Sequence, residues 1–404
     1  MKVSYPRTTY RIALLCLPLF LLSGCWDRTE VNDLALIMAA GIDKKSESSI
    51  ELSVQIFIPK ASGGGGGVGG GMGNGGGGGG EQTLVRSQEG VTIADAMAKL
   101  QAKIPRKIFW GHGEVFIIGE KLARDGIREH ADFLMRNPET RERADLFVCR
   151  GQAKAALELI PPLERSSAEV LREMAITQIG IKTTVKDLAQ MLSGDSGAAA
   201  VPWVEILPPK SKKKEKQTIP YITGTALFKE DKMVGKMDAQ TTKGLLWVRD
   251  EVKLATVTVR PEEAEGFVSA RMLRSKTGFI PKIGEDGWKL TVKIETTNEI
   301  VQNTTRLSML NPEHVKEIEK EAEEEIEHYV RIALLRGQKK LHTDVFGFAD
   351  AFRRKYPKQW NKEKGRWDEI FPEIEVEVEA KVRIIRPGMS SEGAVRPEDE
   401  VRKK

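Results

Sequence analysis

The segment that decides the fold reads Ile374-Glu-Val-Glu-Val-Glu-Ala-Lys-Val-Arg-Ile384, with apolar and polar side chains in strict alternation. A period of two places every second side chain on one face, so this segment is predicted to be a β-strand with one face toward water. A long helix is predicted upstream, where Asn311-Pro312-Glu313 supplies a cap, a proline at the first helical position and an acid in the first turn. Gly337 can end this helix, and its apolar stripe consists of Val315, Ile318, Ala322, Ile326, Tyr329, Val330 and Ala333.

The region before the long helix is rich in predicted strands. Apolar runs separated by turn residues indicate strands, and Lys289–Thr296 places Leu290, Val292 and Ile294 on one face. The other strands predicted here are Tyr221–Phe228, Met233–Gly235, Gly244–Val248 and Phe267–Leu273. After the long helix, Asp344–Lys355 is predicted to be helical.

The amino-terminal part of the chain mixes strands and helices. Ile50–Ile58 alternates like a strand with one buried face, and Leu34–Ile42 is a buried strand or a short helix. Further strands are predicted at Thr83–Arg86, Glu114–Gly119 and Ala144–Arg150, and helices at Val91–Leu100, Ile127–Met135 and Ala153–Leu159. Such interleaving is typical of an α+β or α/β domain.

The length of 404 residues predicts two or three domains. The composition shifts divide the chain into an amino-terminal α+β domain at 25–205, a small β-rich middle domain at 218–260, a carboxyl-terminal α+β domain at 261–388 and a polar tail at 389–404.

A glycine-rich segment interrupts the amino-terminal domain, because 15 of the 18 residues at 63–80 are Gly. Such a segment cannot bury enough apolar area to offset its ordering entropy, so a mobile loop is expected. Runs of Gly also match phosphate-binding patterns trivially, but no glycine-lysine-serine/threonine follows and no helix begins there.

The amino terminus has the pattern of a bacterial lipoprotein signal. Lys2, Arg7 and Arg11 precede an 11-residue apolar run, Ile12–Leu22, which is too short for a spanning helix. The run ends in Leu-Ser-Gly-Cys at 22–25, so residues 1–24 are predicted to be a signal peptide cut between Gly24 and Cys25. The Cys25 thiol would then carry lipid, and two or three acyl chains anchor a protein much more firmly than one. The alternative is a simple secretory signal with an incidental cysteine.

The charge and the cysteine content argue against a nucleic-acid-binding protein, a polytopic membrane protein and a disulfide-bonded protein. Lys+Arg 63 against Asp+Glu 58 gives a net charge of +5; without the three cations of residues 1–24 the balance is 60 against 58, or +2. That balance does not support nucleic-acid binding, and 30% charged residues exclude a polytopic membrane protein. Cys16 leaves with the signal and Cys25 is committed to lipid, so Cys149, in a predicted buried strand, has no disulfide partner.

A basic segment separates the first two domains. Residues 208–216 contain five lysines in nine positions. One interpretation is a solvated loop. The other is contact with anionic lipid headgroups, which attract each nearby cation by about 1 kcal/mol.

No catalytic, metal or cofactor pattern is present in the sequence. The five histidines are scattered, and neither HExxH, CxxC nor GxSxG occurs. The acidic pairs at 317–325 are interpreted as the solvated face of the long helix. His112, beside Trp110 and Glu114, forms the one aromatic-histidine-carboxylate cluster to test, with structural packing as the favoured interpretation. The chain is therefore predicted not to be an enzyme, without a cofactor or metal and with unknown ligand-binding residues.

The chain resembles the Ger(x)C family, the lipoprotein C subunits of nutrient germinant receptors in spore-forming bacteria. The likeness is carried by a Cys-Trp-Asp opening, motifs in the amino-terminal half and an aromatic block near the end; the segments are 24–35, 40–43, 105–112, 118–126, 346–357, Trp360 and 367–372. It extends over nearly the whole mature chain.

The resemblance implies a non-enzymatic receptor component with a fold of three mixed α/β-sheet domains in a row, in the α+β class. It implies attachment through acylated Cys25 to the outer face of the spore inner membrane, and partnership with the A and B subunits of the same receptor. The aromatic residues Phe346, Phe348, Phe352, Trp360 and Trp367 could form partner surfaces. Helical spacing of Phe346, Ala349 and Phe352 favours a place in the core instead.

Two other functions remain open at this point. A lipid-anchored solute-binding protein of a nutrient importer would need two similar lobes around a cleft. An anchored hydrolase would need a buried histidine-carboxylate pair in a deep pocket.

Overall fold

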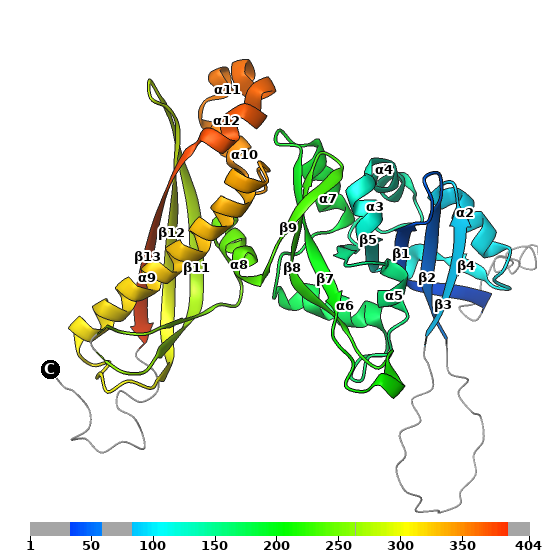
Figure 1. The fold of residues 1–404 in the computed structure, drawn as a ribbon, viewed down its shortest axis with the longest axis horizontal. Helices are drawn as coiled ribbons and strands as arrows, with labels where there is room; N and C mark the ends of the chain where they lie inside the picture. Colours follow the sequence, from blue (N-terminus) through cyan, green and yellow to red (C-terminus); the bar gives the residue numbers. More distant parts are fainter. Residues whose placement is uncertain (1–32, 59–82, 263, 387–404) are drawn as a thin grey trace, which may run out of the picture.

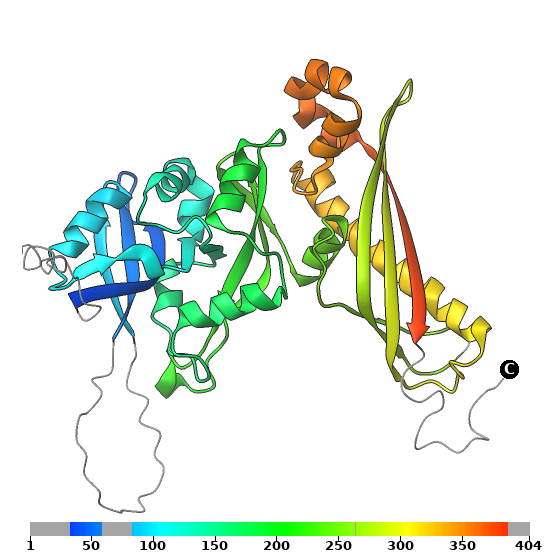
Figure 2. The same cartoon turned by 180° about the vertical axis from the view of Figure 1, so that it is seen from behind.

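The computed structural model describes residues 33–58, 83–262 and 264–386. Within these residues the strands form two sheets, and helices pack on each of them (Figure 1). The two sheets belong to two lobes that lie side by side, a first lobe of residues 33–237 and a second lobe of residues 239–386 (Figure 2). The predicted α+β class is confirmed.

The sheet of the first lobe has the order β3-β2-β1-β5-β6-β7-β8-β9, and the short β4 pairs with the start of β1. Its four central strands are parallel and its two ends are antiparallel hairpins. Parallel strands are buried on both faces, which explains the continuous apolar runs of β5 and β6. The strands are β1 (Leu34–Lys44), β2 (Ile50–Phe57), β3 (Thr83–Gly90), β4 (Lys107–Phe109), β5 (Val115–Gly119), β6 (Asp145–Cys149), β7 (Ala198–Ile206), β8 (Pro220–Lys229) and β9 (Lys232–Met237).

The helices of the first lobe begin at side-chain caps where the sequence provides them. Thr92 caps α2, Ser166 caps α6, and Thr184 caps α7 in a reciprocal capping box with Asp187. The strands and helices predicted for this lobe are present, but β2 is buried on both faces and not on one, and β4, β7, α3, α6 and α7 were not predicted. The helices are α2 (Ile93–Gln101), α3 (Glu120–Asp125), α4 (Arg128–Arg136), α5 (Ala153–Leu157), α6 (Ser167–Thr177) and α7 (Val185–Ser193), with single turns η2 (Trp110–His112) and η3 (Lys212–Lys214).

The sheet of the second lobe has the order β10-β11-β12-β13. A long hairpin of β11 (Val268–Gly284) and β12 (Gly287–Asn303) forms its centre, β10 (Thr256–Val259) pairs with the start of β11, and β13 (Glu375–Arg386) runs parallel to β12. The alternating strand that opens the sequence analysis is β13, with its glutamates exposed and its valines half-buried or buried.

The predicted long helix is α9 (Pro312–Leu334), and Asn311 caps it. Its predicted apolar stripe packs in the core, where Ile318, Ile326 and Val330 have no exposed surface. Gly337 does not end the helical backbone, which continues as a π-helix, η4 (Leu335–Lys340). A Cβ atom at Gly337 would lie 2.7 Å from the Phe346 ring, so this glycine allows close packing.

Short helices cover one end of the second sheet. They are α10 (Phe348–Lys355), α11 (Pro357–Glu363) and α12 (Trp367–Glu373), with the turn η5 (Lys364–Arg366). The first helix starts four residues later than predicted, because the buried Asp344 carboxylate accepts the backbone N–H groups of Gly347, Phe348 and Ala349 and so serves as its cap.

The segment predicted as a middle domain, 218–260, is divided between the lobes. Its strands β8 and β9 extend the first sheet, since β8 pairs with β7. The prediction of a strand at Gly244–Val248 is wrong, because these residues belong to α8 (Ala239–Val248), which is capped by Asp238. The structure thus has two sheets where three domains were expected, and the domain boundaries themselves stay a prediction.

The helices α8 and α9 of the second lobe cross at very short distance, and α8 follows directly after β9 of the first lobe (Figure 1). A Cβ atom at Gly244 would collide with the backbone carbonyl oxygen of Tyr329, and it would lie 2.8 Å from the Cβ of Ala333. Glycine at this position therefore lets the two helix backbones touch.

Glutamates of α9 cover the free edge of β13. The backbone N–H groups of Ala380, Val382 and Ile384 donate to the carboxylates of Glu327, Glu323 and Glu319, at 3.2, 3.0 and 2.7 Å. Four helical residues rise about 6.0 Å and two strand residues about 6.6 Å, so the two repeats nearly match. The interpretation of residues 317–325 as a solvated face is therefore wrong for Glu319 and Glu323, which satisfy edge amides.

We expect Gly244→Ala to lower the free energy of unfolding by about 3 kcal/mol, because the added methyl group forces α8 and α9 apart. Helix propensity alone would favour alanine by about 1 kcal/mol, so a net loss reports the collision. The measurement is urea unfolding, with Gly365→Ala as control, since a Cβ there meets no atom within 4 Å. An unchanged midpoint for Gly244→Ala would contradict this account of the crossing.

Replacing Glu319, Glu323 and Glu327 together by alanine should speed hydrogen exchange at the amides of Ala380, Val382 and Ile384 about tenfold, because those amides lose charged acceptors. The triple glutamine variant keeps an acceptor oxygen at each position and should retain most of the protection.

Hydrogen exchange of the second lobe measures this effect, and Glu324→Ala on the exposed face of α9 is the control. Equal protection in the alanine and wild-type chains would show that these contacts do not hold the edge.

Candidate functional site: the junction of the two lobes and the motif residues

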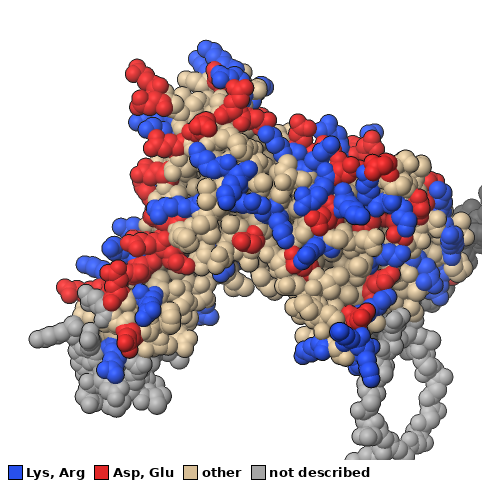
Figure 3. All heavy atoms as spheres, in the orientation of Figure 1, with Lys and Arg blue, Asp and Glu red and all other residues tan. Residues whose placement is uncertain are grey.

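A hollow lies at the junction of the lobes. It has a volume of about 1110 Å³ and is lined by α7, the end of α8, β11 and the segment 344–355. In Figure 3, blue and red side chains lie together over this junction. The lining contains five cations and six carboxylates, so the site has no charge preference for an anion or a cation; they are Lys182, Arg249, Lys253, Arg354, Lys355, Asp187, Asp195, Asp250, Glu251, Asp344 and Asp350.

Polar contacts span the junction around this cavity. Arg353 pairs with Asp195 at 2.7 Å, and Lys229 pairs with Asp368 at 3.0 Å. Exposed ion pairs of this kind contribute less than about 1 kcal/mol each, so they guide the orientation of the lobes more than they hold it. The cavity is therefore bordered by ion pairs between the two lobes.

The predicted His112 cluster is not a catalytic arrangement. Glu114 pairs with Arg172 at 2.9 Å and with Arg141 at 3.5 Å, while His112 packs edge-on against the Phe109 ring. Trp110 is buried in the core of the first lobe. The three side chains thus serve packing and ion pairing, as the favoured interpretation had it.

The other titratable candidates are also dispersed. His314 is buried on α9 with its Nδ1 3.0 Å from the Ser308 carbonyl oxygen, and burial lowers the pKa of His130 on α4. Across the described ranges, no three His, Cys, Asp or Glu side chains are grouped to hold a metal ion.

Cys149 lies in the interior of the first sheet without exposed surface. Burial, with further contributions from Asp43, Glu205 and Glu120, raises the pKa of its thiol to about 12. The predicted role as a buried structural thiol is confirmed.

The aromatic block of the second lobe is core and not an exposed surface. Phe346, Phe348, Phe352, Trp360 and Trp367 are each at most 4% exposed. Their rings contact one another, for example Trp360 and Trp367 with centroids 5.0 Å apart. The interpretation as a partner surface is wrong for these side chains.

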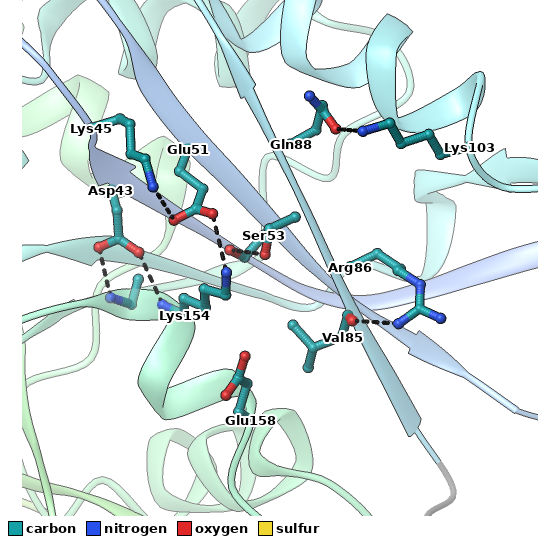
Figure 4. A network of polar contacts seen from close by, with 12 residues as sticks. Asp43, Lys45, Glu51, Ser53, Val85, Arg86, Gln88, Lys103, Lys154 and Glu158 are labelled. Atoms are coloured by element: carbon teal, nitrogen blue, oxygen red, sulfur yellow. Dashed lines mark hydrogen bonds and ion pairs between the residues drawn. The ribbon is translucent and has the colours of Figure 1, made fainter.

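Figure 4 shows Asp43, from the motif 40–43, beside Lys154 of α5, and Gly119 from the motif 118–126 lies against the same carboxylate. The buried Asp43 carboxylate accepts the backbone N–H groups of Ala153 and Lys154, at 2.7 and 3.0 Å, and so fixes the start of α5. A Cβ atom at Gly119 would collide with this carboxylate, which explains a glycine in the second motif. Burial raises the pKa of Asp43, opposed by these hydrogen bonds and by Lys154.

Gln55 of β2 fixes the other end of α5, and sequence reasoning missed it. Its side-chain amide donates to the carbonyl oxygen of Leu157 at 2.8 Å, and its carbonyl oxygen accepts the Ala168 N–H at 3.3 Å. Gln55 is completely buried. Because β2 also contains Glu51 and Ser53, the sequence offered no distinct signal for this contact.

The predicted signal peptide, the cleavage site at Gly24 and Cys25, the glycine-rich segment 63–80 and the polar tail lie outside the described residues. Over the described part of the chain, no helix combines the length and apolar character needed to cross a membrane.

Two family sequence models match the chain, one in each half. The "Spore germination protein N-terminal domain" matches residues 27–206, and the domain described as "Spore germination B3/ GerAC like, C-terminal" matches residues 223–388.

Full-length relatives agree with these matches. A protein of Bacillus subtilis (strain 168) named "Putative spore germination protein YfkR" is 30% identical over 387 residues. The match covers 95% of this chain and 98% of that protein. Spore germination protein KC of the same organism is 28% identical, and the match covers 93% of this chain and 95% of that protein. The crystal structure of the GerBC protein is similar with a TM-score of 0.56 at 18% identity, over 86% of this chain and 97% of that one, which shows a shared fold.

The raised pKa of Cys149 leads to a chemical prediction. At neutral pH only about one thiol in 10⁵ is ionised, and the side chain is buried, so iodoacetamide should not label Cys149 in the folded chain. A Cys25→Ser chain has this one thiol after signal removal, and it should react once unfolded in urea. Stoichiometric labelling of the folded chain would contradict the assignment.

Proposed function

The chain belongs to the Ger(x)C family of spore germination proteins, and from this premise we propose that it acts as the lipid-anchored C subunit of a spore nutrient germinant receptor. The observation that carries the proposal is the extent of the match: family domains cover both lobes, and relatives with spore germination names align over more than nine-tenths of the chain.

A receptor subunit needs no catalytic residues, and the family is not a known enzyme class. The two lobes differ in strand number and order, so the arrangement does not support the alternative of a solute-binding protein with two similar lobes. We propose that the chain stabilises the receptor assembly or transmits a nutrient-induced change. The cavity at the junction gives the two lobes room to shift relative to each other.

The anchor is the lipid carried by Cys25 as the first residue of the mature chain. Cys25 lies nine positions before Leu34 at the start of β1, a span of at most about 30 Å when fully extended. Lipidation would hold the first lobe close to the outer face of the spore inner membrane. It would also raise the effective concentration of the chain beside the A and B subunits, its proposed partners.

A Cys25→Ala chain should fold normally, yet leave the spore membrane fraction and fail to support the response to nutrient germinants, because the thiol that carries the lipid is gone. Membrane fractionation and a germination assay on spores that contain only this variant measure the two effects. Affinity capture from detergent-solubilised spore membranes asks whether the A and B subunits co-purify with the wild-type chain.

Cys149→Ala is the matched control, since it removes the other cysteine of the mature chain and should leave membrane retention intact. Normal germination of spores that contain only Cys25→Ala would overturn the proposed anchor.

A further inference from the structure

Two loops of the first lobe are bound to each other and form one tip, residues 158–166 and 207–219. The Ile160 N–H donates to the carbonyl oxygen of Lys216 at 2.7 Å, and the Lys216 ammonium pairs with Glu158 at 2.9 Å. The Thr218 hydroxyl donates to the carbonyl oxygen of Leu207, which closes the base of the second loop. These contacts hold the two loops together as one surface, which is called the tip below.

The core of the first lobe holds the tip in place. The first of its loops leaves α5 at Leu157 and returns at Ser167, and Gln55 hydrogen-bonds to both of these residues. Asp43 fixes the other end of α5. Buried polar contacts of this kind position the loop relative to β1 and β2.

The tip combines exposed apolar side chains with cations. Leu163 is 92% exposed and Leu207 is 42% exposed. The second loop is exposed from 207 to 217 and contains five lysines and one glutamate. Among the described residues, four of these lysines form no ion pair: Lys210, Lys212, Lys213 and Lys214. Figure 3 shows Lys and Arg side chains gathered at this end of the lobe.

The first loop of the tip leaves α5 beside the middle of β1, the strand that follows the predicted anchor in the chain. Gln55, which binds the tip, pairs across the sheet with Ala39, five residues after the start of β1 at Leu34. In Figures 1 and 2, the loop between β7 and β8 and the open ends of β2 and β3 point to the same side. A surface near the start of β1 is within reach of a bilayer that holds Cys25.

We propose that the tip is a membrane-binding surface, in which the lysines contact the anionic headgroups of a lipid bilayer and Leu163 enters the interface. An unpaired lysine keeps its full charge for such contact, and an exposed leucine gains by leaving water. The location of the tip relative to the bilayer rests on the proposed anchor at Cys25. The contact would turn a tethered chain into an oriented one.

Vesicle sedimentation tests the tip separately from the anchor. The mature chain, residues 25–404 with Cys25→Ser, is mixed with phosphatidylcholine vesicles that contain about 30% phosphatidylglycerol, at about 0.1 M salt. We expect binding to these vesicles and none to pure phosphatidylcholine. Changing Lys210, Lys212, Lys213 and Lys214 to glutamine should lower the partition coefficient at least about a hundredfold, since each lysine contributes about fivefold.

A matched control changes four exposed lysines of the second lobe, Lys316, Lys340, Lys358 and Lys362, to glutamine and should bind like the parent chain. For the apolar contact, Leu163→Asp should lower binding about tenfold, whereas Leu254→Asp, at a leucine 73% exposed in the second lobe, should not.

Two outcomes would overturn the proposal: no binding of the Cys25→Ser chain to anionic vesicles, or equal binding by the four-lysine variant of the tip and its control. Neither outcome tests the proposed lipid on Cys25, because the vesicle assay uses a chain that lacks this cysteine. Conversely, normal germination of spores with Cys25→Ala would contradict the proposed anchor but would not change the interpretation of the vesicle experiment.

Discussion

The contact between α8 and α9 is the constraint on which the arrangement of the molecule depends. The first sheet leads through β9 directly into α8, and α9 packs along the second sheet. Only a residue without a side chain at Gly244 lets these helices approach so closely. Around the crossing, Gly235 and Gly337 likewise leave room for Leu341 and for Phe346 and Met237. Gly235 and Gly337 pack against Leu341 and Met237 of the other lobe, so close packing at glycines joins the lobes together with the exposed ion pairs.

Periodic patterns in the sequence predicted the elements that bury one face. The alternation of 374–384 and the apolar stripe of α9 both correspond to what the structure shows, because a period is set by local geometry. The failure at Gly244–Val248 has a physical reason as well. A short apolar run fits a strand or a buried helix equally well, and here the Asp238 cap and the packing against α9 decide for the helix. Contacts that depend on tertiary structure, such as that of Gln55 with Leu157, leave no pattern in the sequence.

Several residues that carry the family likeness have structural roles. Asp43 and Gly119 come from separate motifs and meet at the start of α5, while Phe346 and Trp360 fill the core of the second lobe. What identifies the family is thus the framework of the fold. A subunit that works by position and contact needs such a framework more than it needs reactive groups, and its interaction surfaces can lie on loops outside the motifs.

The glutamates that cover β13 have a consequence for proteins crowded on a surface. A chain confined to a bilayer meets its neighbours far more often than one that diffuses in three dimensions, and an open strand edge would then add strands from neighbour to neighbour. Carboxylates that occupy the edge amides also repel the same carboxylates on an adjacent copy. Under the proposed membrane anchoring, many copies can therefore share a small area without the second sheets merging into fibrils.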